Sequence, residues 1–448
     1  MKVTGIIAEY NPFHNGHRYH IEQARKTTGA DYIVVMMSGT FTQRGTPACF
    51  DKFTRAKMAL ENGADLVLEL PVCYATSSAE TFAEGGVCLL NQTGIVDYLC
   101  FGAEPIAQTT LLSENNLSHP TTTSTTNTVS EQTAKKEKAS PTEALSAKHF
   151  LQTAAFFANE PTEYKAKLKA YLKDGHSFPT ARNLAATPFL SETECHLLAS
   201  PNNLLGLEYC KALLRKHSAI QPVPITRSGA GYHDTTISAK GFASASAIRK
   251  ELLSCLETQT PFSDKIALAV PDSVAKQFQS KPFLYMTEED FYPLLYYRLL
   301  YEDITPNYFL DFSKELTDRF KKATLPLSYE SLVEYLKTKQ YTRTRIERAL
   351  LHVLLQITTT DFQSFRETET GYLRILGFRK EASPLLRALQ NKASVPVITK
   401  LSDAKKQLST DAYTMLSYDI RAARLYNAQV YHKYQVLLPD EYAYLVIL

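Results

Sequence analysis

The sequence has no apolar run that approaches the roughly 20 residues needed to cross a bilayer. Its first segment, residues 2–8, is too short for a signal peptide and leads directly into a polar motif. We therefore expect a soluble cytoplasmic protein with no membrane partner.

Cysteine is scarce, with seven residues in 448 and no Cys-x-x-Cys pair. An odd number of widely spaced cysteines is not typical of a disulfide framework or a zinc site. We expect reduced and mostly buried thiols at these positions: Cys49, Cys73, Cys88, Cys100, Cys195, Cys210 and Cys255.

The sequence also lacks a strong excess of one charge, because its formal net charge is only +3. Total charge therefore does not indicate a nucleic-acid-binding protein, and any RNA-binding surface must be a local patch. The chain is too long for one ordinary hydrophobic core, so two domains are expected.

What is present near the start is a polar motif, Tyr10-Asn11-Pro12-Phe13-His14-Asn15-Gly16-His17. It follows an apolar run at residues 3–8 and precedes a helical pattern at 18–28. At a helix start, free backbone N–H groups and the helix dipole favour an anion such as a triphosphate, which the two histidines would face. Gly16 permits close approach of a phosphate or adenine to the backbone. Taken alone, two histidines at this spacing are also typical of a helix cap and a surface residue.

The first hundred residues alternate between strand and helix patterns, which predicts an α/β fold with a Rossmann-like, doubly wound parallel sheet. The expected strands are 3–10, 32–37, 66–70 and 98–101, and the expected helices are 17–28, 52–62 and 78–90. Ligands of such sheets bind at the carboxyl ends of the strands. The segments 11–17, 38–44 and 102–104 all lie there, which indicates one shared site.

Later segments are less regular. Residues 105–146 are rich in Thr, Ser, Asn and Lys and are expected to form a disordered insertion. Helical patterns at 147–172 and 203–217 and a strand at 222–227 follow. Beyond about residue 262 the pattern is almost wholly helical until the run at 442–448. We predict a catalytic domain at 1–260 and a mostly α-helical C-terminal domain at 261–448.

Two further segments carry candidate phosphate-binding groups. Ser244-Ala245-Ser246-Ala247-Ile248-Arg249 opens a helix, where serine hydroxyls and an arginine can hold phosphates. A serine cap followed by an exposed arginine is the simpler interpretation. Lys52 and Arg55 also begin a helix, and they are either ligands of a triphosphate or carboxylate or solvent-facing cations.

Basic residues gather twice in the C-terminal half. Lys337, Lys339, Arg343, Arg345 and Arg348 form the first cluster, and Arg374, Arg379 and Lys380 form the second. Cations beside exposed tyrosines can hold an RNA backbone and stack an unpaired base. The alternative is a solvated charged helix face.

Several motifs, in order, resemble the bacterial tRNA(Met) cytidine acetate ligase family of the HxGH nucleotidyltransferase superfamily. The segments that carry the resemblance are 9–17, 38–45, 63–71, 200–203, 231–234 and 344–348. Ser244–Arg249 is similar to the second signature of the superfamily, usually written ISSTxxR.

The resemblance implies an ATP-dependent ligase that activates acetate as acetyl-adenylate and transfers acetyl to the wobble cytidine of elongator tRNA(Met), forming N4-acetylcytidine. It implies ATP and Mg²⁺ as cofactors, tRNA and acetate as partners, and His14, His17 and Arg249 as catalytic residues. The residues expected to bind the nucleotide are Ile7, Ala8, Glu9, Tyr10, Asn11, Pro12, Phe13, His14, Asn15, Gly16, His17, Arg18, Tyr19, His20, Gly102, Asn202, Arg227, Ser244 and Ser246.

Two alternatives stay open. A small-molecule adenylyltransferase of the NAD or coenzyme A type explains the His14–His17 and Ser244–Arg249 motifs equally well, but not the large helical region. A non-catalytic RNA-binding protein on the same scaffold would not need both histidines.

Overall fold

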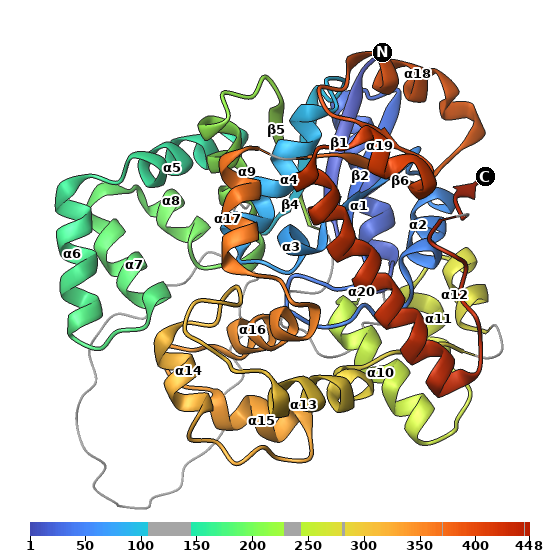
Figure 1. Cartoon of the computed structure of the whole chain (residues 1–448). Helices are drawn as coiled ribbons and strands as arrows, with labels where there is room; N and C mark the ends of the chain where they lie inside the picture. The colour runs from blue at the N-terminus through green and yellow to red at the C-terminus, as the bar shows by residue number, and fades with distance from the viewer. Residues whose placement is uncertain (106–144, 228–242, 280–282, 370, 443) are drawn as a thin grey trace, which may run out of the picture.

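A computed structural model describes residues 1–105, 145–227, 243–279, 283–369, 371–442 and 444–448 (Figure 1). The remaining residues include most of the expected insertion at 105–146 and the motif at 231–234. Those two expectations therefore lie outside the described residues. Within the described ranges, no helix combines the length and the apolar character that crossing a bilayer requires. All seven cysteines are free thiols and five of them are buried, as expected.

The described strands form one central sheet in the order β5-β4-β1-β2-β3-β6-β7, with β8 also paired to β6. The first five strands are mutually parallel, which confirms the α/β fold class. Their bounds are β1 Val3–Ala8, β2 Tyr32–Ser38, β3 Leu66–Leu70, β4 Tyr98–Ala103 and β5 Gln221–Thr226.

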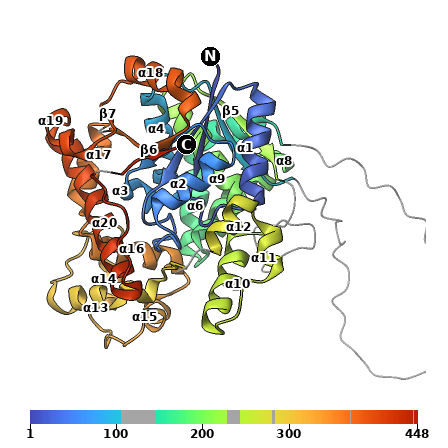
Figure 2. The same ribbon diagram turned by 90° about the vertical axis from the view of Figure 1, so that its right-hand side faces the viewer.

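The sheet is buried on both faces, as parallel sheets require. Along β2, Ile33 and Val35 join one core cluster, whereas Val34 and Met36 join another. Helices of the two clusters cover the opposite faces, and Figure 2 shows the sheet between them. On the side of Ile33 lie α1 Asn15–Thr28, α2 Lys52–Glu61, α10 Ala245–Glu257, α11 Asp264–Ala269 and α12 Asp272–Phe278. On the side of Val34 lie α3 Val72–Ala75, α4 Ala79–Gln92, α5 Ala147–Asn159 and α9 Pro201–Arg215.

Helices α6 Thr162–Lys173, α7 Phe178–Ala186 and α8 Glu192–Leu197 extend away from the sheet beside α5 (Figure 1). A third core cluster is separate from both faces of the sheet. It is built from α13 Tyr292–Tyr301, α14 Lys314–Phe320, α15 Tyr329–Leu336 and α16 Arg343–Leu355. Short 3₁₀ turns lie at Thr187–Phe189, Glu288–Phe291, Lys380–Ala382 and Leu401–Asp403.

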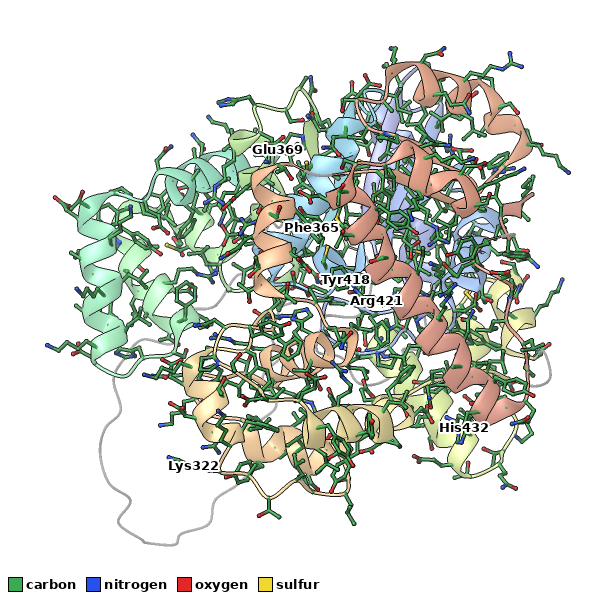
Figure 3. The ribbon with its side chains drawn as sticks, in the orientation of Figure 1. Lys322, Phe365, Glu369, Tyr418, Arg421 and His432 are labelled. Carbon is green, nitrogen blue, oxygen red and sulfur yellow. The ribbon has the colours of Figure 1, made fainter. Side chains whose placement is uncertain are left out.

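The mostly helical character of the C-terminal half is confirmed, but its last part returns to the sheet. After α17 Thr359–Glu367, strand β6 Leu373–Phe378 pairs antiparallel with β3. The segments that complete it are α18 Ser383–Lys392, β7 Val397–Ile398, α19 Ala404–Gln407, α20 Thr410–Tyr434 and β8 Val446–Ile447. In Figure 3, α20 lies beside α17, and the Phe365 and Tyr418 ring centroids are 6.3 Å apart. The expected division into two domains at residue 260 stays a prediction. Strands from both sides of this position share one sheet.

A buried ion network joins this C-terminal part to the sheet. Lys52 Nζ lies 2.7 Å from Glu69 Oε1 and 2.7 Å from Glu441 Oε2. Arg374 contacts the same two carboxylates at 3.0 and 2.6 Å. Burial disfavours the charge of Arg374, but the two carboxylates outweigh it and raise the pKa of the guanidinium. Each side chain is at most 5% exposed.

The network corrects two expectations. Arg374 was grouped with a basic RNA-binding patch and Lys52 with a phosphate site, yet both are structural cations. Arg55 is also fully buried, and its guanidinium donates to the carbonyl oxygens of Glu9, Ser38, Gly39 and Phe50. Sequence alone gave no sign of these partners, because Glu441 and Glu69 are 372 residues apart.

We predict that Glu441→Gln lowers the free energy of unfolding by about 3 kcal/mol or more, since it leaves buried Lys52 and Arg374 with one carboxylate. Urea unfolding followed by circular dichroism measures the change. The matched control is Glu381→Gln at a mostly exposed pair with Arg379, which should cost less than about 0.5 kcal/mol. Equal effects of the two variants would contradict the role given to the network.

Candidate active site

A cavity of about 460 Å³ lies at the carboxyl ends of β1, β4 and β5. The segment after β1, the start of α1, the loop after β2, α9 and the start of α10 form its walls. The predicted residues that line it are Ile7, Ala8, Glu9, Tyr10, Asn11, His14, Gly16, His17, Tyr19, His20, Gly102, Asn202, Arg227, Ser244, Ser246 and Arg249. Segments far apart in the sequence therefore meet at one site, as the strand-end argument predicted.

His14 and His17 are held by the first turn of α1. His14 is the N-cap residue, and its Nδ1 accepts a hydrogen bond from Gly16 N at 3.0 Å. The Nδ1 of His17 accepts from His14 N at 3.3 Å, which completes a capping box. The two rings are stacked with centroids 3.7 Å apart. Because both Nδ1 atoms accept, the proton of each neutral ring is on Nε2.

Both imidazoles are neutral at pH 7. Burial, followed by the charges of Arg227 and Arg249, lowers the pKa of His14 to about 3. Burial, then His14 and Arg227, lowers the pKa of His17 well below its ordinary value. The next histidine on this helix face, His20, has a pKa of about 4 for the same reason, burial. Neutral rings donate from Nε2 without the cost of burying charge.

The segment between β1 and α1 is a tight turn. Tyr10 has a φ of 50°, and the Asn11–Pro12 peptide bond is cis. Asn11 fixes the turn twice, because its Oδ1 accepts from Cys49 N at 2.8 Å and its carbonyl accepts from Arg249 Nη1 at 2.5 Å. Arg249 also donates to Ser246 Oγ at 3.2 Å. The guanidinium therefore connects the start of α10 to the turn that carries the histidines.

Ser244 is the N-cap of α10, and its Oγ accepts from Ala247 N at 3.0 Å. The capping interpretation is therefore correct, but the same residue lines the cavity.

Gly102 and Arg227 lie at the ends of the paired strands β4 and β5. A Cβ at Gly102 would lie 3.3 Å from Arg227 Cγ, so glycine permits the close approach of the arginine. Ser200 is the N-cap of α9, so Asn202 does not cap that helix. Asn202 is the second helical residue, and its Nδ2 donates to Glu104 Oε1 at 2.6 Å.

Four of the predicted nucleotide-binding residues do not line the cavity. Phe13 is fully buried in the core, and Pro12 lies in the turn. Asn15 Nδ2 donates to Leu268 O, and Arg18 pairs with Glu22 at 2.8 Å on the surface. Consecutive residues of a turn and helix point in different directions, so a continuous run of contacts is not possible.

Sequence reasoning did not select several lining residues. Thr42, Gln43 and Arg44 belong to the loop after β2, which the pattern had placed at the site without assigning a role. The apolar side chains of Phe82, Leu204, Leu205 and Tyr209 are among the others. Their helical spacing is the same as that of ordinary core residues, so no signal distinguishes them.

The cavity wall formed by α1, β5 and α10 fits a polyphosphate. It carries Arg227 and Arg249, two imidazole donors and the serine hydroxyls. A Cβ added to Gly16 would lie 2.8 Å from His14 Cε1, so only glycine permits this ring position. Among the described residues, no three His, Cys, Asp or Glu side chains gather as a metal-binding group.

The fold and the paired histidines at the end of β1 define a nucleotidyltransferase-type protein. The family model described as HIGH Nucleotidyl Transferase matches residues 1–142 and 140–437. The curated tRNA(Met) cytidine acetate ligase of Acetivibrio thermocellus is 37% identical, covering 95% of this chain and 94% of that protein. The protein of the same name from Thermoanaerobacter sp. strain X514 is also 37% identical, covering 95% of each chain.

Among solved structures, apo TmcAL of Thermotoga maritima superposes with a TM-score of 0.81 and 28% identity, covering 100% of both chains. TmcAL bound with alpha-thio ATP gives a TM-score of 0.79 at 28% identity, covering 100% of this chain and 99% of that one. The chain belongs to the tRNA(Met) cytidine acetate ligase family of HIGH nucleotidyltransferases.

We predict that His14→Asn flattens the pH dependence of stability. The pKa of His14 is lower in the folded state than in the unfolded chain, so the unfolded chain takes up the proton first and stability falls as pH falls below about 6.5. Between pH 7 and 5.5 one such histidine costs about 1.3 kcal/mol. Asparagine is a good N-cap and keeps the first turn.

The measurement is urea unfolding of both proteins at the two pH values. The wild type should lose about 1.3 kcal/mol more than His14→Asn over this range. Parallel pH dependence in the two proteins would show that His14 is not buried in neutral form.

Proposed function

We propose that the protein is an ATP-dependent ligase that joins acetate to the wobble cytidine of elongator tRNA(Met). The observation that carries the proposal is the pair of neutral histidines that form the capping box of α1 and line the cavity together with Arg249. The chain is 37% identical to a ligase of this name. ATP as substrate is supported by the similar TmcAL structure bound with alpha-thio ATP.

In the first step, an acetate oxygen attacks the α-phosphorus of ATP, and the bond to the β-phosphate breaks. Acetyl-adenylate and pyrophosphate result. His14 and His17 donate from Nε2 to phosphate oxygens, and Arg249 stabilises the charge of the leaving pyrophosphate. The nucleophile belongs to the substrate, so no Ser-His-Asp or Cys-His arrangement is needed. Mg²⁺ held mainly by the phosphates would neutralise part of their charge.

In the second step, the exocyclic amine of the cytidine attacks the carbonyl carbon of the adenylate, and AMP leaves. The adenylate reacts readily with water, so the cavity must admit an unstacked base and exclude solvent. The apolar side chains of Phe82, Leu204, Leu205 and Tyr209 provide such a wall.

We propose that residues 261–448 contribute to tRNA binding. The helical cluster of α13 to α16 reaches the cavity loop, because a Cβ at Gly45 would lie 2.4 Å from Arg348 N. Most cations of the first basic cluster are paired. Arg343 contacts Glu330 at 2.5 Å, and Arg348 contacts Asp311 at 3.0 Å. Arg345, which lies 4.5 Å from the Tyr341 ring centroid, is the better candidate for stacking a base.

The two alternative functions are less well supported. A small-molecule adenylyltransferase needs the same phosphate-binding wall but no helical cluster beside the cavity loop. A non-catalytic RNA-binding protein would gain nothing from two neutral imidazoles that line a cavity beside two arginines.

We predict that the full-length protein transfers label from acetate to elongator tRNA(Met) in the presence of ATP and Mg²⁺. Nucleoside mass spectrometry of the digested tRNA should show N4-acetylcytidine. Omission of ATP should abolish transfer, because free acetate does not acylate an aromatic amine. Dinucleotide formation from mononucleotides without tRNA labelling would support the adenylyltransferase instead.

We predict that His17→Gln slows acetate-dependent ATP–pyrophosphate exchange by about 10² to 10³, because one donor to the phosphates is lost. Glutamine at this helix position can keep the reciprocal capping bond. Affinity for tRNA should change less than about twofold, since the phosphate contacts that dominate RNA binding lie elsewhere.

The matched control is His149→Gln, at the equivalent position of the capping box of α5, which is not among the residues that line the cavity. It should retain full exchange. Equal loss of exchange in both variants would mean that the effect comes from the helix cap and not from the phosphate donor.

A further inference from the structure

Glu9 is the one acidic side chain among the described residues that line the cavity. The other charged side chains that line the cavity, Arg44, Arg227 and Arg249, are cations, which suits a polyphosphate. A carboxylate beside phosphates is repelled, so Glu9 is better suited to an uncharged part of a substrate.

Glu9 lies on the cavity wall that faces away from the histidine side. Side chains alternate along an extended segment, and Glu9 follows β1 on the same side as Ile7. Ile7 packs against the cluster that contains Phe82 and Tyr209, whereas Ile6 and Tyr10 belong to the cluster of α1 and α10. The charge of Glu9 also acts on Tyr209, in agreement with this direction.

The Glu9 carboxylate is fixed but has acceptor capacity left. Its Oε1 accepts from Gln43 N at 2.6 Å, and its backbone carbonyl accepts from Arg55 Nη1 at 2.6 Å. No group in the described part of the chain donates to Oε2. The residue is half-buried, so Oε2 can meet a substrate group within the cavity.

The wall around Glu9 suits a pyrimidine base better than a second anion. Phe82, Leu204, Leu205 and Tyr209 give an apolar surface on which a planar ring can lie. A carboxylate accepts from the N4 amine of cytosine. It repels uracil, which presents the O4 acceptor in place of the amine.

We propose that Glu9 is a catalytic and specificity-determining residue of the acetyl transfer step. The inference rests on the proposed function. Glu9 Oε2 accepts an N4–H bond of the target cytosine and orients the nitrogen toward the acetyl-adenylate. As N4 forms its bond to the carbonyl carbon, the bond from that carbon to the phosphate oxygen breaks and AMP leaves with the electron pair. The proton of N4 passes to Glu9 and then to water.

This role differs from nucleotide binding, to which the sequence had assigned Glu9. It also gives the second step a proton acceptor, which the amide product requires because N4 must lose one hydrogen. An amine that has attacked a carbonyl carries positive charge, so its proton is acidic enough for a carboxylate to take.

The test is Glu9→Gln in the full-length protein, because the amide oxygen can still accept from Gln43 N. Acetate-dependent ATP–pyrophosphate exchange measures the first step, and single-turnover transfer from synthetic acetyl-adenylate to unmodified elongator tRNA(Met) measures the second. Exchange should stay within about threefold, whereas transfer should fall about 100-fold. Glu22→Gln on the surface of α1 is the matched control and should retain both steps.

Transfer by Glu9→Gln at near wild-type rate would overturn the assignment. A parallel loss of exchange and transfer would also overturn it, since a metal-binding or purely structural carboxylate acts on both steps. If the wild type itself transfers no acetyl group, the proposed function fails as well.

Specificity gives a second readout. Two unlabelled tRNA(Met) transcripts are compared as competitors of wild-type transfer, one with cytidine and one with uridine at the target position. The uridine transcript should inhibit transfer more weakly than the cytidine transcript. In Glu9→Gln this discrimination should fall by at least about fivefold, because the amide can donate to O4 of uracil. Unchanged discrimination would overturn the specificity role.

Discussion

The site depends on a capping interaction between two histidines and their own backbone. In an ordinary helix start, serine or aspartate satisfies the free N–H groups. Here imidazole nitrogens do so, and the interaction determines which nitrogen of each ring carries the proton. The same contacts that begin α1 therefore also set the direction of two neutral donors. Helix formation and the proposed phosphate recognition are one arrangement, and Gly16 permits it because a Cβ there would lie 2.8 Å from His14 Cε1.

The surroundings of this helix start are fixed from distant parts of the chain. Arg249 of α10 donates to the carbonyl of Asn11, and buried Arg55 donates to the carbonyl of Glu9. Two guanidinium groups thus hold the turn after β1 through its backbone carbonyls. The ion network of Lys52, Glu69, Arg374 and Glu441 then connects α2 and β3 to the last strands. Through these contacts the C-terminal residues stabilise the frame in which the first motif lies.

The sequence predicted the parallel sheet well because buried strands between helices give a strong local pattern. The first four predicted strands match β1 to β4 within two residues, and the predicted strand at 222–227 matches β5 within one. Strands β6 and β7 were missed, since β7 has only two residues and β6 pairs with a strand some 300 positions earlier. The site residues of the His14–His17 and Ser244–Arg249 segments were predicted for the same reason, because each motif is a short continuous stretch of sequence. The roles of Lys52, Arg55 and Arg374 could not be found, because burial and ion pairing are properties of the fold.

The cavity walls differ in chemistry because they come from opposite faces of the sheet. The wall from α1 and α10 is cationic and rich in hydrogen-bond donors, whereas the wall from α4 and α9 is mostly apolar apart from Asn202. Glu9, in the segment after β1, is the one carboxylate among the described lining residues. Successive residues of β1 alternate between these faces, so a short segment after the strand presents Glu9 to one wall and Tyr10 to the other. A polyphosphate and an uncharged base can therefore occupy one cavity without competing for the same groups. A ligase that passes from phosphate chemistry to amide formation without moving its intermediate needs this separation, and a central parallel strand supplies it.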